Sequence, residues 1–185
     1  MSLTDIKNRN FQSPLNFEFR VDRLTDFNFF VQKINIPTLN IGTANMATPF
    51  VNLPMLGDHA QFGELTVEFK LDEGMRGWYE IFSWMQAISF PERQSQYGDL
   101  VLGKTKNLDG KVKPTYTTRS VGDIYGQGIL TINSSANNPL VAITFVDIHP
   151  ISLSEAIFDT TNTEVAYVSC SVGFKYDYYT VEKIG

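Results

Sequence analysis

Strict alternation of apolar and polar residues marks several stretches of the chain as half-buried β-strands. In 15–22 apolar residues occupy every odd position, and polar residues fill the even positions between them. The stretch 64–71 repeats this pattern. The longest case covers 166–178 and predicts a single strand roughly 40 Å long. A weaker strand pattern lies at 29–36, which is apolar on both faces and so is expected to be buried on both. Further weak strand patterns lie at 128–132 and 140–148, and at 100–102 and 115–119, which could flank a hairpin.

One segment has the spacing of an amphipathic helix. Apolar residues recur every three or four positions, and Phe90-Pro91 should end the helix. Asp72 is expected to cap its start, and a second, shorter helical turn is expected near 152–158. The sequence therefore predicts a mainly β chain with one principal α-helix, an α+β class. The apolar stripe of the helix consists of Met75, Trp78, Phe82 and Met85.

The segment 41–61 departs from the regular patterns because it combines glycine, proline and apolar residues with few charges. A loop this long inside a compact domain is usually functional or disordered, and this composition is too apolar for disorder. We therefore expect an extended arm or hairpin that binds a partner. Its apolar residues are Met46, Phe50, Leu53, Met55 and Leu56.

Length and charge narrow the class of protein. The 185 residues suit a single domain over 1–185. A net charge of −5 disfavours tight wrapping around DNA, for which a basic surface is typical. No apolar run approaches the roughly 18 residues of a membrane span, so no membrane is expected among the partners.

Little in the sequence points to catalysis. The chain has one cysteine, Cys170, and its two histidines, His59 and His149, lie far apart, so neither a metal nor a cofactor site is expected. A hydrolase using the carboxylates of Asp72 with Glu73, or of Asp58 with Glu64, remains an alternative, although a helix cap and a strand face explain these residues. A second alternative is a β-sandwich that binds a sugar or a protein surface through Tyr176, Tyr178 and Tyr179.

Sequence segments along most of the chain occur in a characteristic order: two strands before a long loop, a Gly-Asp turn and strand, a helix containing Trp84, and a closing strand. They are 14–21, 30–37, 57–58, 62–69, 71–73, 148–154 and 176–179. In order and spacing these segments resemble the tail tube proteins of contractile-tailed bacteriophages. The middle of the chain, 91–139, looks longer than in a simple tube subunit and is interpreted as a variable insertion. This leaves open a repeating tube subunit or a specialised ring that initiates the tube at the baseplate or terminates it at the head.

The resemblance implies a β-sandwich or barrel fold and a structural virion protein without enzymatic activity. Its hexameric rings would join their inner sheets into one continuous barrel and stack into a tube through which DNA passes. The implied partners are further copies, tail sheath, and baseplate or neck proteins, in a virion tail assembled in the host cytoplasm. The tube of a bacterial contractile injection system is a near variant.

In that setting the arm would reach the adjacent ring, and an acidic subunit would let DNA pass without holding it. The polar face of the long strands is then expected to line the channel. Its residues are Glu64, Thr66, Glu68, Lys70, Ser169, Ser171, Lys175 and Asp177.

Overall fold

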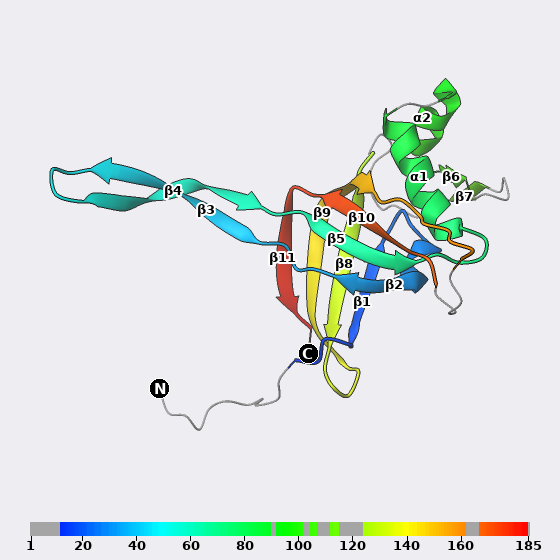
Figure 1. Ribbon diagram of the computed structural model, residues 1–185, viewed down its shortest axis with the longest axis horizontal. Helices are drawn as coiled ribbons and strands as arrows, with labels where there is room; N and C mark the ends of the chain where they lie inside the picture. The colour runs from blue at the N-terminus through cyan, green and yellow to red at the C-terminus, as the bar shows by residue number, and fades with distance from the viewer. Residues whose placement is uncertain are drawn as a thin grey trace.

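The computed structural model describes residues 12–89, 92–101, 104–106, 112–114, 124–161 and 167–184 (Figure 1). Strands dominate it, with two α-helices and one short 3₁₀-helix in the described residues. The helices are η2 (Phe27–Phe30), α1 (Arg76–Ser89) and α2 (Gln94–Val101). The strands are β1 (Phe17–Val21), β2 (Val31–Ile34), β3 (Leu39–Ala47), β4 (Asn52–Phe62), β5 (Leu65–Lys70), β6 (Lys104–Lys106), β7 (Val112–Pro114), β8 (Gly126–Asn133), β9 (Pro139–Leu153), β10 (Ser169–Lys175) and β11 (Tyr178–Lys183).

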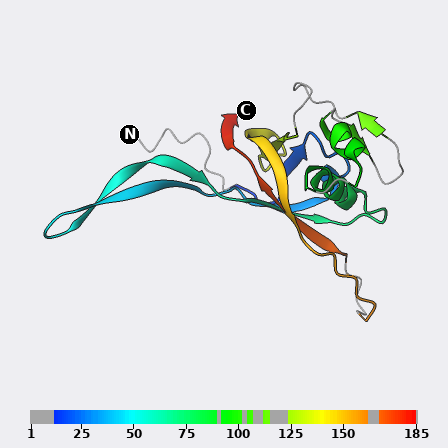
Figure 2. The ribbon, with the colours of Figure 1, turned by 90° about the horizontal axis from the view of Figure 1, so that it is seen from above.

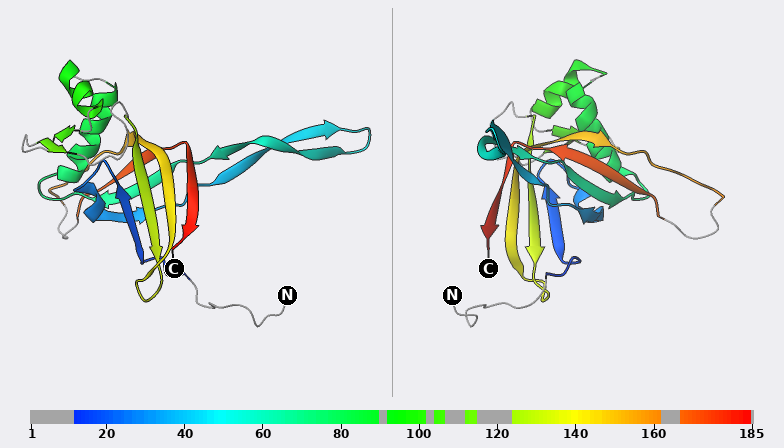
Figure 3. Two further views of the ribbon diagram at one scale, coloured as in Figure 1. Left: turned by 180° about the vertical axis from the view of Figure 1, so that it is seen from behind. Right: turned by 60° about the vertical axis from the view of Figure 1, so that its left-hand side comes forward.

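Seven strands form one antiparallel sheet that folds over itself into two layers. We call the layer β1-β8-β9-β11 sheet A and the layer β9-β10-β5-β2 sheet B; the first part of β9 belongs to sheet A and its last part, 149–153, to sheet B. Figures 1 and 3 show the strands of the two layers running in crossing directions. A corner in one long strand therefore joins two packed sheets.

The corner of β9 lies at Asp147, whose φ of 57° is in the left-handed region. Before it, Val146 pairs with Tyr178 in sheet A. After it, His149 pairs with Lys175 in sheet B. A residue of this conformation bends a strand sharply, so β9 can serve both layers.

The hydrophobic core fills the space between the layers, and α1 covers one end (Figure 3). Aromatic rings dominate it: Phe27 from η2 packs edge-on against Phe69, with ring centroids 4.9 Å apart, and against Phe174 at 6.4 Å. The core residues on the strands are Phe19, Val21, Leu65, Val67, Phe69, Leu130, Ile143, Phe145, Ile148, Cys170, Val172 and Phe174. All of those in β1 and β5 occupy the apolar positions of the predicted alternation.

The prediction of one long strand over 166–178 is wrong. β10 ends at Lys175 in sheet B, and β11 starts at Tyr178 in sheet A. Between them Tyr176 is buried against Phe145, with ring centroids 5.0 Å apart. The backbone N–H of Asp177 donates to the carbonyl of Val146 at 3.0 Å. The chain thus turns from one layer into the other without interrupting the alternation of its side chains.

The predicted cap and apolar face of the helix need correction. α1 begins at Arg76, because Glu73 and Gly74 form a turn that the N–H of Met75 closes by donating to the carbonyl of Asp72, and Met75 itself has a φ of 51°. Asp72 therefore does not cap the helix. Met75, Trp78, Phe82 and Met85 are only half-buried. The buried face consists of Gly77, Glu80, Ile81, Trp84 and Ala87.

Other predicted elements shift as well. Residues 27–30 form η2 rather than strand, and Phe29 is 84% exposed, so 29–36 is not buried on both faces. The expected helical turn at 152–158 is absent, since β9 continues to Leu153 and 154–158 has no regular structure. Of the strands expected at 100–102 and 115–119, residues 100–101 belong to helix α2, and residues 115–119 lie outside the described residues. The strands that pair in this part of the chain are β6 and β7.

Candidate assembly surfaces

Strands β3 and β4 form a hairpin that projects far from the two-layer body (Figures 1 and 2). Its base is held by aromatic packing, since Phe62 lies edge-on to Tyr179 at 5.3 Å and to Tyr176 at 6.0 Å between ring centroids. The Tyr176 hydroxyl donates to the carbonyl of Gly63 at 3.1 Å. Burial raises the pKa of Tyr176 to about 12, so this phenol remains a donor at neutral pH. The hairpin therefore extends from an ordered base.

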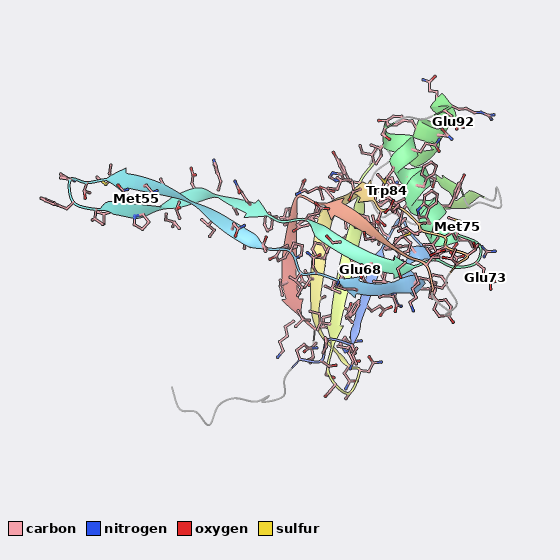
Figure 4. All side chains as sticks on the ribbon, viewed as in Figure 1. Met55, Glu68, Glu73, Met75, Trp84 and Glu92 are labelled. Atoms are coloured by element: carbon pink, nitrogen blue, oxygen red, sulfur yellow. The ribbon has the colours of Figure 1, made fainter. Side chains whose placement is uncertain are left out.

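The outer part of the hairpin has one apolar face. Opposed pairs in the ladder share a face, and the pairs Ala44–Met55 and Met46–Leu53 alternate with Asn45–Pro54 and Ala47–Asn52. Met46, Leu53 and Met55 are 56%, 47% and 53% exposed, and no charged residue lies between Thr43 and Gly57. Figure 4 labels Met55 on this part of the hairpin, well away from the body. An uncharged apolar ribbon that the described chain leaves uncovered is typical of an interaction surface.

The five predicted arm residues divide between several positions. Met46, Leu53 and Met55 share the apolar face, Leu56 pairs with Thr43 on the opposite face, and Phe50 lies in the turn between the strands with 98% exposure. Apolar composition located this segment in the sequence. The register, which includes an irregularity between Ile41 and Thr43, decides which residues share a face.

Most of the predicted channel residues lie on the outward face of sheet B. The ladder between β10 and β5 places Ser169 opposite Lys70, Ser171 opposite Glu68 and Gly173 opposite Thr66. Figure 4 labels Glu68 on β5. Lys33 of β2 adds a cation to this face through an ion pair with Glu68 at 2.8 Å. Glu64 precedes β5 and lies over Gly173, Lys175 ends β10, and Asp177 lies in the link to β11 rather than on this face. That these residues line a channel stays a prediction.

A buried carboxylate that the sequence analysis missed joins α1 to the chain before η2. Glu80 is 2% exposed and accepts hydrogen bonds from the backbone N–H groups of Thr25, Asp26 and Phe27 and from the Thr25 hydroxyl, at 2.7–3.3 Å. Burial raises the pKa of Glu80, while these hydrogen bonds oppose the rise. The only sequence signal was a lone acid on the helical stripe Gly77, Ile81 and Trp84.

The three tyrosines of the binding-module alternative do not share one exposed face, although the rings of Tyr176 and Tyr179 pack with centroids 6.1 Å apart. Tyr176 is buried and Tyr179 faces the core, whereas Tyr178 is 48% exposed on the opposite face of β11. Asp58 is exposed on the hairpin beside His59, 3.6 Å away. The described residues contain no group of three or more His, Cys, Asp or Glu side chains that could hold a metal ion. No helix in the described part is long and apolar enough to cross a membrane.

No family model and no curated protein sequence matches the chain. Solved structures do match, over nearly its whole length. A chain of the anti-feeding prophage cap, described as a tube terminating cap, has a TM-score of 0.64 at 17% identity, covering 100% of both chains. A chain of the extended sheath-tube complex of the PVC extracellular contractile injection system has a TM-score of 0.63 at 13% identity, covering 100% of this chain and 99% of that one. The chain has the contractile-tail tube fold.

A third tube-fold structure, the PVC sheath/tube terminator in the extended state, matches with a TM-score of 0.61 at 13% identity, covering 95% of this chain and 99% of that one. Of the expected fold, a mainly β tube fold with one principal α-helix, the coarser part is confirmed: the chain is mostly β with few helices and has a tube-like fold. A single copy of this tube-fold chain contains no closed barrel, because its sheets are open in the described residues.

Proposed function

We propose that the protein is a structural ring subunit of a contractile tail or injection tube, with no enzymatic role. The observation that carries the proposal is the tube fold shared, over the full length of both chains, with a tube-terminating cap. The projecting apolar hairpin supports it, because such a surface needs a partner to cover it. Residues 1–185 would act as one domain, with the hairpin as its arm and 91–139 as the region that varies.

In the proposed assembly, hexameric rings stack into a tube, and the hairpin of one copy packs against the adjacent ring. Sheath, baseplate or neck proteins would contact the tube or its ends. The proposal covers the repeating subunit and a specialised cap or terminator ring alike, because a chain of each kind of complex has nearly the same TM-score, 0.63 and 0.64. If the tube belongs to a phage, the net charge of −5 suits passage of DNA without tight binding.

Neighbouring residues on opposite faces of the hairpin provide a matched test. Met46→Glu places a charge on the apolar face, whereas Asn45→Glu places the same charge on the other face, one residue away. Burying a methionine contributes about 1.5–3 kcal/mol, so Met46→Glu should raise the protein concentration needed for assembly by at least roughly tenfold. Asn45→Glu should assemble much more like the unaltered protein.

The measurement is sedimentation velocity over a concentration series, with circular dichroism to confirm that both variants fold. Selective loss of assembly in Met46→Glu supports the hairpin as the inter-ring contact. Equal assembly of the two variants would contradict that role. An unaltered protein that sediments as a monomer at all concentrations, also when mixed with preformed tubes, would contradict the ring function itself.

A further inference from the structure

We propose that Met46 and Met55 form an oxidation site on the apolar face of the hairpin, at which hydrogen peroxide converts the free subunit into a form that cannot join a tube. This inference rests on the proposed ring function and assigns a reversible modification to the hairpin. It follows from the exposure of the two thioethers, from the side chains around them and from the shielding of the other described sulfur atoms.

The two hairpin methionines are the most exposed sulfur-containing residues in the described part of the chain. Each is more than half exposed, and Figure 4 shows Met55 far from the two-layer body. The pairs Ala44–Met55 and Met46–Leu53 follow one another on the same face. The two methionines are therefore diagonal neighbours, with Cα atoms roughly 7–8 Å apart. Peroxide dissolved in water can reach both sulfur atoms at one place.

The other described sulfur atoms are shielded. Met75, just before α1, and Met85, on α1, are half-buried, and Met85 packs against the core. Cys170 is buried, and this burial raises the pKa of its thiol. Little of the thiolate therefore forms at neutral pH, and the thiolate is the form of cysteine that peroxide oxidises. Among the described residues, dilute peroxide should act first on the hairpin.

The reaction adds one oxygen atom to each thioether. The methionine sulfur attacks one oxygen of hydrogen peroxide, and the O–O bond breaks as the S–O bond forms. The departing hydroxide takes the proton from the transferred oxygen and leaves as water. The sulfur thereby loses two electrons and the peroxide gains them. The product, methionine sulfoxide, carries a polar S=O group in place of an apolar sulfur.

A sulfoxide on this face has no hydrogen-bond donor beside it on the hairpin. The face consists of Ala44, Met46, Leu53 and Met55, whose side chains contain no donor group. Packing against an adjacent ring would take the S=O oxygen out of water, and burying a polar group without a hydrogen bond is unfavourable. Oxidation of the pair should therefore raise the protein concentration needed for assembly by at least about tenfold.

The fold of the subunit should tolerate the change. The ladder between β3 and β4 is made by backbone groups, and the base of the hairpin is held by Phe62, Tyr176 and Tyr179. Methionine sulfoxide reductases reverse the modification: two thiols form a disulfide, and the oxygen leaves as water. In a stacked tube the hairpin face would be covered, so the modification would act on free subunits and spare finished tubes.

The first measurement compares the assembly of the free protein before and after brief treatment with dilute hydrogen peroxide. Trypsin cleaves at Lys33 and Lys70 and isolates both hairpin methionines in one peptide, 34–70, apart from the other methionines. Mass spectrometry should show this peptide gaining oxygen first. Sedimentation velocity should show at least about a tenfold rise in the concentration needed for assembly, with an unchanged circular dichroism spectrum. Methionine sulfoxide reductases A and B with dithiothreitol should restore assembly.

Two double variants separate the hairpin from the rest of the chain. Met46→Leu/Met55→Leu retains an apolar face that cannot form sulfoxides, so peroxide should leave its assembly as it was before treatment. The control Met75→Leu/Met85→Leu retains the hairpin methionines, so peroxide should weaken its assembly as it does in the unaltered protein. Each variant is compared with its own untreated sample, which removes any effect of the leucines themselves.

Three results would overturn the oxidation site and leave the ring function intact. They are equal assembly of treated and untreated protein although peptide 34–70 is oxidised, oxidation of the other methionines ahead of this peptide, and loss of assembly in treated Met46→Leu/Met55→Leu. Failure of the untreated, unaltered protein to assemble, alone or with preformed tubes, would instead count against the ring function on which the proposal depends.

Discussion

Glu80 is a buried carboxylate whose protonation is coupled to folding. Its carboxylate is buried at the junction of α1 and the chain before η2, where three backbone N–H groups and one hydroxyl donate to it. Because burial raises the pKa of Glu80 above its ordinary value of 4.5, the native state retains the proton to a higher pH than the unfolded chain does. The free energy of unfolding therefore falls as the pH rises from about 4.5 through the raised native value.

Glu80→Gln should remove this fall, because an amide does not titrate. It should also lower the free energy of unfolding by about 1–3 kcal/mol, since the amide NH₂ group meets backbone donors. The measurement is urea unfolding at several pH values between 4.5 and 8, with the exposed Glu73→Gln as control. An unchanged dependence on pH in Glu80→Gln would contradict the assignment.

Gly57 lies at a close approach between the two paired strands of the hairpin. A Cβ on Gly57 would lie 2.2 Å from the carbonyl oxygen of Gly42, whereas a Cβ on Gly42 would meet only the His59 carbonyl oxygen, at 4.0 Å. Gly57→Ala should therefore force the strands apart and weaken the hairpin ladder, and Gly42→Ala should not. Hydrogen exchange of the hairpin amides measures the difference. Equal protection of the hairpin amides in the two variants would contradict a role of this close approach in the stability of the hairpin.

Sequence patterns predicted elements better than they predicted sheet membership. Alternation identified β1 and β5 because each has one face on the core. It failed at Tyr176, where the side chains continue to alternate while the chain passes from sheet B to sheet A. Alternation reports which way a side chain faces and carries no information on the neighbouring strand. Apolar composition similarly located the arm, but only the register shows that Met46 and Met55 share a face.

At the scale of the whole molecule, two features are incomplete in one copy: the apolar hairpin and the open edges of sheet A. The hairpin projects along one direction, and the open edges belong to β1 and β11 on opposite sides of sheet A (Figure 1). The hairpin is the surface on which the proposed contact between rings depends.

Electron microscopy of the purified protein across a concentration series tests the ring claim most directly. The unaltered protein should form rings with a central channel, alone or stacked into tubes, and Met46→Glu should form single rings rather than tubes. Particles that remain monomeric at every concentration, including after addition of preformed tubes or rings, would contradict it.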